Sequence, residues 1–339
     1  MGTDMGRCFF LVIFAALLGA AEPLRICASV PELGLIAQAV GGEQVTVTVF
    51  AKPGDDPHHV DPRPSFVVVL ARADFLIETG LEQEVGWLPP LVLQARNARL
   101  AMGQPGRLVA ADAVEILERP TGPIDRSQGD VHPGGNPHFL LDPVNAVLVG
   151  DRVAARLSAL RPAAAATFAA AAQALRNAIG EALAGPVLHA RFDGVKLGIL
   201  AGRQGLVGFL REQGAATDLG GWLARLGPQA GRRVVVDHNL WPYVAQRFGL
   251  VTVGALEPLP GVAPSSRHLA SVVAIIREQQ VGALLVSPFF DRRVVDVVVA
   301  ASGVHVAAMA HQPGSMPGTG TLLEWYGHNV DELVRALAP

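Results

Sequence analysis

The sequence predicts an α/β protein with two lobes, each a parallel sheet flanked by helices, joined by a single long helix. Two observations predict the lobes: buried strand patterns alternate with amphipathic helix patterns after Leu24, and the same alternation returns after Arg232. A third observation predicts the connection, because an Ala- and Leu-rich run fills residues 142–184. A length of 339 residues agrees with about two domains.

The first segment, residues 1–21, has the pattern of an export signal. Arg7 precedes an apolar run from Cys8 to Leu18, and small residues follow up to Ala21, where we expect cleavage. The run is shorter than the roughly 20 apolar residues that span a membrane. Cys8 lies before the apolar run and is therefore wrongly placed for a lipid-modified mature N-terminus. We expect a soluble periplasmic protein.

Residues 22–141 are expected to form the N-terminal lobe. LRICASV is a buried strand pattern, PELGLIAQAVGG a helix and QVTVTVFA a strand with period two. The proline-rich loop KPGDDPHHVDPRP follows, Ser65 is expected to cap the helix FVVVLARA, and DFLIETG returns as a strand. From about Arg119 to Pro137 the sequence is typical of a loop.

Residues 142–184 are expected to form the linking helix, in which Pro162 is the one strong helix breaker. Some 40 helical residues would extend about 60 Å. Residues 185–339 are expected to form the C-terminal lobe. Within it, residues 185–232 are ambiguous and receive no chemical role, and strands then alternate with helices from RVVVDH to a last helix ending near Leu337.

Composition limits the function classes. The net charge of −3 offers no basic surface for nucleic acid, and the half-apolar composition excludes a disordered acidic protein. Two cysteines against 10 histidines leave neither a disulfide framework nor a cysteine-rich zinc module. Cys27 lies in an apparent strand and is expected to be a small core residue. Any metal must therefore be bound by imidazole and carboxylate.

Three histidines lie where an α/β fold places its ligands. His58 follows the strand that ends at Ala51, His238 ends the strand RVVVDH, and His138 precedes the long helix. Ligands gather beyond the carboxyl ends of parallel strands, where loops converge and helices begin. A single histidine in a loop is more often a solvated or hydrogen-bonded residue than a metal ligand.

The motifs around these histidines favour a role as metal ligands. PGDDPHHVDPRPS, GNPHFLLDP and VVVDHNLWPYVAQRFGL resemble, in order and spacing, the zinc- and manganese-binding periplasmic solute-binding proteins of ABC importers. The resemblance implies a metal held in the cleft between the lobes, with His58, His138 and His238 as ligands. Zinc members resemble this chain in having His at the third position, and imidazole suits zinc.

The fourth ligand is where the chain departs from that family. Many relatives have an Asp after the final strand, whereas MAHQPGSMPGTG contains no acid. His311 could replace it, Asp291 is a further candidate that we also expect to cap a helix, and water is the third alternative.

The remaining histidines are expected to have other roles. His59 and His132 lie near the expected cleft mouth, where they could collect metal, and Asp61 and Asp142 could orient ligands. Surface or structural roles are expected for the other four, which are His189, His268, His305 and His328.

The sequence thus predicts a non-enzymatic monomer that captures Zn(II), its transported ligand, outside the cytoplasmic membrane. Its expected partners are the permease subunits of an ABC importer, with no catalytic residue, no cofactor and no nucleic acid. One alternative is a Mn(II)-binding transport protein. A secreted zinc hydrolase is another, but it needs a general base such as that of HExxH, and no such pair is present. A surface adhesion protein on the same scaffold is the third.

Overall fold

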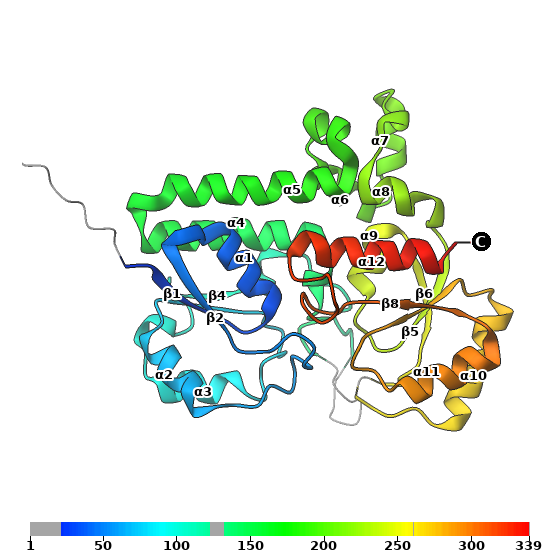
Figure 1. Ribbon diagram of the computed structural model, residues 1–339, viewed down its shortest axis with the longest axis horizontal. Helices are drawn as coiled ribbons and strands as arrows, with labels where there is room; N and C mark the ends of the chain where they lie inside the picture. Colours follow the sequence, from blue (N-terminus) through cyan, green and yellow to red (C-terminus); the bar gives the residue numbers. More distant parts are fainter. Residues whose placement is uncertain (1–21, 123–131, 260, 339) are drawn as a thin grey trace, which may run out of the picture.

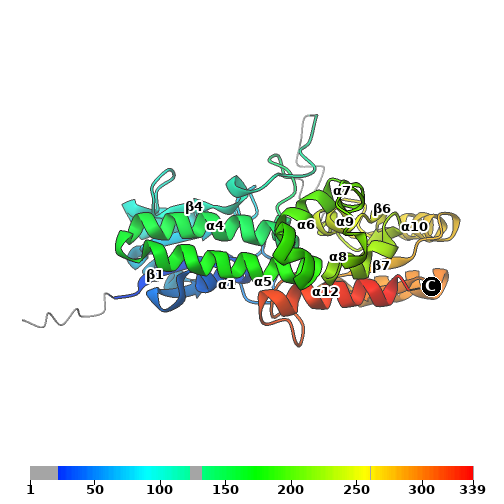
Figure 2. The same ribbon diagram turned by 90° about the horizontal axis from the view of Figure 1, so that it is seen from above.

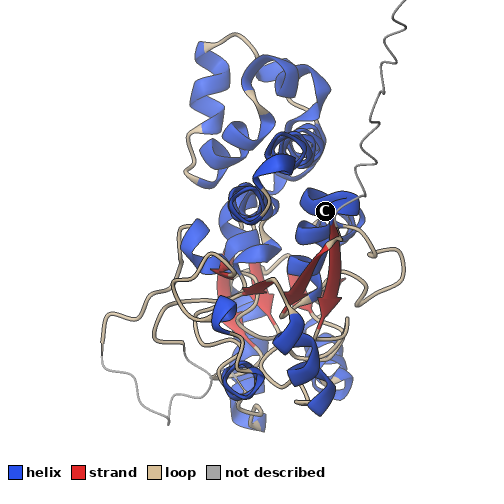
Figure 3. Cartoon of the chain, turned by 90° about the vertical axis from the view of Figure 1, so that its left-hand side faces the viewer, coloured by secondary structure: helices blue, strands red, loops and turns tan. Residues whose placement is uncertain are grey.

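The computed structural model describes residues 22–122, 132–259 and 261–338. Within them, two four-stranded parallel sheets form two lobes side by side, each with helices on both faces (Figure 1). The view along the long axis shows the same layers, with a further group of helices standing above them (Figure 3). The predicted fold class is therefore confirmed. The predicted export signal lies outside the described residues.

The N-terminal lobe has the strand order β2-β1-β3-β4. Helices α1 and α4 cover one face of the sheet, and α2 and α3 cover the other (Figure 1). α3 and β4 were not predicted, and α2 begins at Pro64 after an Arg63 N-cap, so the predicted capping role of Ser65 is wrong. A proline at the first helical position loses no hydrogen bond, which explains this start. The elements are β1 (Leu24–Ala28), α1 (Pro31–Gly41), β2 (Val45–Val49), α2 (Pro64–Arg72), β3 (Phe75–Glu78), α3 (Leu88–Ala95) and β4 (Arg107–Val109).

The C-terminal lobe repeats this arrangement with the order β6-β5-β7-β8. In both sheets the first strand lies between the second and the third, so the chain reverses direction across the sheet beside that strand. Crevices that bind ligands form at such points. The elements are β5 (Arg233–Val236), α9 (Pro242–Phe248), β6 (Val251–Ala255), α10 (Ser266–Glu278), β7 (Ala283–Val286), α11 (Arg292–Ser302), β8 (His305–Ala308) and α12 (Leu322–Ala336).

A long helix between the lobes is present, but the predicted continuous helix over residues 142–184 is corrected. The run forms α4 (Pro143–Leu160) and α5 (Ala165–Phe192), with a short 3-10 turn at Pro162–Ala164 between them. The two helices lie side by side (Figure 2). Pro162 explains the break, because the residue before a proline avoids helical angles, and Arg161 has φ −139° and ψ 77°. α5 extends beyond residue 184 with a kink at Gly185.

The ambiguous residues 185–232 are mostly helical. After α5 come α6 (Gly194–Gly202), α7 (Leu206–Glu212) and α8 (Gly221–Leu226), which rise above the C-terminal lobe (Figure 1). Asp193 accepts a hydrogen bond from the backbone N–H of Val195 and so caps α6. In the described residues, no helix is both long and apolar enough to cross a membrane.

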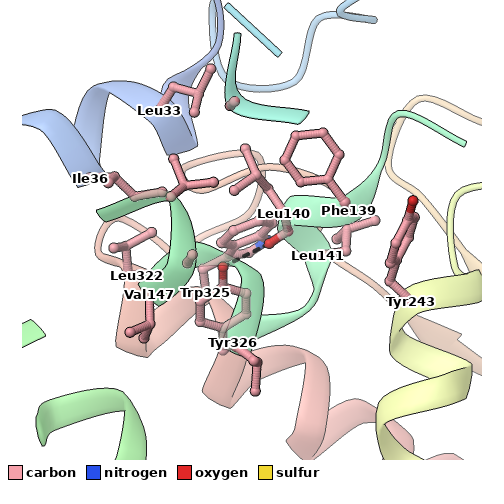
Figure 4. Close-up of a cluster of buried hydrophobic side chains, with 14 of the residues drawn as sticks. Leu33, Ile36, Phe139, Leu140, Leu141, Val147, Tyr243, Leu322, Trp325 and Tyr326 are labelled. Carbon is pink, nitrogen blue, oxygen red and sulfur yellow. Dashed lines mark hydrogen bonds between the residues drawn. The ribbon is translucent and has the colours of Figure 1, made fainter. Parts of the chain in front are cut away.

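The two lobes share a hydrophobic junction. Leu33 and Ile36 of α1, the segment around Leu140, and Trp325 and Tyr326 of α12 pack together (Figure 4). The Tyr326 hydroxyl donates a hydrogen bond of 2.7 Å to the Leu140 carbonyl. This junction fixes the segment just after His138 against an element of the C-terminal lobe.

Candidate metal site between the lobes

His58, His138 and His238 come together at the cleft. The His138 ring lies 5.4 Å from the His58 ring and 6.2 Å from the His238 ring, measured between centroids. All three line one cavity of about 80 Å³. The part of the chain that the structure describes has no group of three or more His, Cys, Asp or Glu side chains already arranged to hold a metal ion. The ligand roles of His58, His138 and His238 therefore stay a prediction.

His58 is oriented by its own loop. Asp56 Oδ1 accepts from the His58 backbone N–H at 2.9 Å and lies 2.8 Å from His58 Nδ1. Burial opposes charge on Asp56, but the hydrogen bonds from His58 outweigh it and lower the pKa of this carboxyl to about 2. The loop is also anchored by Trp87, whose indole N–H donates to the Pro57 carbonyl. The ionised Asp56 favours a proton on Nδ1, so that Nε2 is the nitrogen of His58 that could bind a metal.

Glu257 is to His238 what Asp56 is to His58, and it was not predicted from the sequence. Glu257 Oε2 lies 2.6 Å from His238 Nδ1, and Glu257 also lines the cavity. Burial disfavours the imidazolium of His238, but the hydrogen bond and charge of Glu257 raise the pKa overall. Glu257 comes two residues after β6, so the rule that placed His238 at a strand end could also have found it.

His138 lies between the other two. Its backbone N–H donates 3.0 Å to Asn136 Oδ1, in the turn that precedes the short helix Phe139–Leu141. Burial, followed by the neighbouring histidines His58 and His238, lowers the pKa of His138 well below its usual value. The neutral imidazole that metal binding requires is therefore the resting form of His138.

The structure separates the candidates for a fourth ligand. Asp291 caps α11 by accepting from the Arg293 backbone N–H and pairs with the Arg293 guanidinium, as its capping role predicted. It is not among the residues that line the cavity of the three histidines. His311 is buried and lines a second cavity of about 20 Å³ on which His138 also borders. Its pKa falls to about 4 because of burial, so it is a neutral imidazole.

The second cavity is lined in part by buried polar side chains. Four of its buried side chains carry an atom that has no hydrogen-bond partner among the described residues, namely Glu32, Gln83, His311 and Gln312. Such atoms are costly to bury, and a cavity of this size holds about one water molecule. The cavity is therefore suited to a bound polar species beside His138.

Glu32 should make stability depend on pH. Burial, reinforced by the charge of Glu84, raises the pKa of Glu32 to about 8. The folded protein then keeps a proton on Glu32 that the unfolded chain releases above the ordinary glutamate pKa of 4.5. The stabilising contribution is present below that pH and is lost as the pH rises toward 8, by up to about 1.4 kcal/mol per pH unit. We expect Glu32→Gln to flatten this fall in denaturant-unfolding curves between pH 5 and pH 8. If the stability of the parent and of Glu32→Gln fell in parallel over this pH range, the assignment of the effect to Glu32 would be contradicted.

Other predicted residues have structural surroundings. Asp61 is exposed, while Asp142 caps α4 and forms a buried ion pair with Arg247. The carboxylates that contact His58 and His238 are Asp56 and Glu257. Burial raises the pKa of the Cys27 thiol to about 12, in keeping with its predicted core role. Four histidines make hydrogen bonds to backbone groups, as expected for structural roles: His189, His268, His305 and His328.

Comparison with known proteins adds to this geometry. The family model of ZnuA, described as zinc-uptake complex component A, periplasmic, matches residues 26–184 and 220–336. The chain belongs to this family. It is therefore a periplasmic-type solute-binding protein and not an enzyme. It captures a divalent metal outside the cytoplasm for an ABC uptake system. The unmatched residues 185–219 cover the end of α5, all of α6 and α7, and the loop that follows α7.

Two relatives carry different metals in their names. The manganese-binding lipoprotein MntA of Halalkalibacterium halodurans is 24% identical over 347 residues, covering 98% of each chain. The high-affinity zinc uptake system protein ZnuA of Yersinia pestis is 23% identical over 328 residues, covering 92% of this chain and 90% of its own. A crystal structure of ZnuA has a TM-score of 0.67 at 18% identity, covering 94% of this chain and all of the other, and supports the fold.

Proposed function

We propose that this family member captures Zn(II) through His58, His138 and His238 and delivers it to the permease of its ABC importer. The observation that carries the proposal is the convergence of the three imidazoles from both lobes on one cavity. Nitrogen donors at one site bind zinc more tightly than manganese, by ligand preference and by the usual order of metal affinities.

Manganese is the second candidate, favoured by a specific observation. Asp56 and Glu257 also line the cavity, and carboxylate oxygens are the ligands that manganese prefers. Each of these carboxylates is held by the Nδ1 atom of a histidine. In that role they orient the imidazoles, which strengthens nitrogen ligation and favours zinc.

Metal competition distinguishes the two candidates. Protein purified from the periplasm is expected to contain zinc by elemental analysis, and the stripped protein is expected to bind Zn(II) more tightly than Mn(II) in competition with a chromogenic chelator. Zinc binding should remain tight when manganese is in large excess. Preferential retention of manganese would assign the protein to manganese transport.

Metal binding is proposed to move the lobes little. The hydrophobic junction that includes Trp325 and Leu140 joins α12 to the segment after His138. A wide opening of the cleft would expose this buried surface to water, at a cost of roughly 25 cal/mol per Å². Loop ordering and small side-chain shifts are the less costly response.

A further inference from the structure

His132 is held beside the three-histidine cavity by a turn. The Gly135 N–H donates 3.1 Å to the His132 carbonyl, and Gly135 has φ 104°, a backbone conformation that favours glycine. A Cβ at Gly135 would lie 2.7 Å from the Leu117 carbonyl oxygen. The turn can therefore form here only with glycine, and it packs directly against the N-terminal lobe.

The residue after this turn anchors it to both lobes. The Asn136 backbone N–H donates to the Leu117 carbonyl at 3.0 Å, and the Asn136 side chain donates to the Asn239 carbonyl at 2.9 Å. The Tyr243 hydroxyl donates to the Asn136 carbonyl at 2.8 Å. Asn239 follows His238 directly, so the turn that carries His132 is tied to the segment that carries His238.

The imidazole of His132 faces the metal-binding nitrogen of His58. The two Nε2 atoms are 3.1 Å apart, and the rings stack with centroids 5.0 Å apart. Because Asp56 holds the Nδ1 atom of His58, this contact involves the nitrogen that is free for a metal. A tetrahedral zinc ion with bonds of about 2.0–2.1 Å separates neighbouring ligand nitrogens by about 3.3–3.4 Å. The observed pair is close to that edge length.

We propose that His132 is a fourth imidazole ligand, which completes an all-nitrogen zinc site with His58, His138 and His238. This inference rests on the proposed function and adds a residue that determines specificity. A metal ion bound by both Nε2 atoms would replace the hydrogen bond between them, and four nitrogen donors select zinc over manganese. His311 faces the separate inner cavity and its Nε2 lies 3.3 Å from the Asp55 carbonyl, so its geometry is less suited to this role.

The test compares His132→Ala and His132→Gln with the parent protein, using zinc and manganese alone as probes in chelator competition. Glutamine can still hydrogen-bond to His58 but lacks the imidazole. We expect both variants to lose at least about 10- to 100-fold in zinc affinity. That range is the usual loss when a group that only supports a ligand is removed, and losing a ligand should cost no less. Manganese affinity should change little, so the preference for zinc falls by the same factor. His305→Ala, which removes an exposed histidine on β8, is the control and should bind as the parent does.

The outcomes separate this inference from the proposed function. Parent-like zinc affinity in both His132 variants, together with weakened binding in His58→Ala, would overturn the role of His132 alone. Parent-like affinity in His132→Gln but not in His132→Ala would also overturn it, because the side chain would then act through a hydrogen bond. Parent-like affinity in His58→Ala as well would overturn the proposed function. Visible spectra of the Co(II)-loaded parent and variants should also differ if a ligand is lost.

Discussion

Replacing His138 with alanine is expected to weaken zinc binding by more than about 100-fold, which exceeds the usual effect of losing a group that only supports a ligand. His138 lies between His58 and His238, and its lowered pKa keeps it in the neutral form that binds metal. His58→Ala and His238→Ala should act in the same direction. Equilibrium competition with a zinc chelator measures all three.

The matched control is His268→Ala. His268 lies on α10 and bonds the Ala255 carbonyl through Nε2. The variant removes one imidazole from the same lobe that carries His238, yet it should leave zinc affinity unchanged. Parent-like affinity in all three site variants would mean that the metal is bound elsewhere.

Replacing Asp142 with alanine is expected to destabilise the protein by about 3 to 5 kcal/mol, because a buried guanidinium would lose its partner. The side chains of Asp142 and Arg247 are 1% and 7% exposed, and Arg247 Nε donates 2.9 Å to Asp142 Oδ1. Asp142 also accepts from the Val144 backbone N–H and so caps α4. Denaturant unfolding measures the loss.

The same helix offers a matched comparison. Asp151, also on α4, pairs with Arg176, but its side chain is 43% exposed. Asp151→Ala should cost at most about 1 kcal/mol, since exposed ion pairs contribute little. The double variant Asp142→Leu with Arg247→Met should recover much of the stability lost in Asp142→Ala. If Asp142→Ala and Asp151→Ala lowered the free energy of unfolding equally, burial of the Asp142–Arg247 pair would not explain the effect.

The fold was predictable because its signals are local. Period-two runs such as VTVTV and amphipathic runs such as that of α10 identify their elements without tertiary information. The exact path of the long helical run was harder to predict from the sequence. Pro162 was visible as a breaker, but only the packing of α4 against α5 decides that the chain turns back there.

The site was predictable only in part, for a physical reason. His58 and His238 follow strand ends, which a sequence pattern reveals. Other residues that contact these histidines depend on how loops converge in space. His132 is 74 residues from His58, and Glu257 is 19 residues from His238. In both cases the residue type was suitable, but its proximity becomes evident only in the folded chain.

X-ray absorption spectroscopy of the zinc-loaded protein tests the central claim most directly, because it reports the atoms bound to the ion. We expect nitrogen ligands at about 2.0–2.1 Å with the outer-shell scattering of at least three imidazole rings. That scattering should diminish in His138→Ala. A zinc environment of oxygen ligands with one imidazole or none would contradict the three-histidine site.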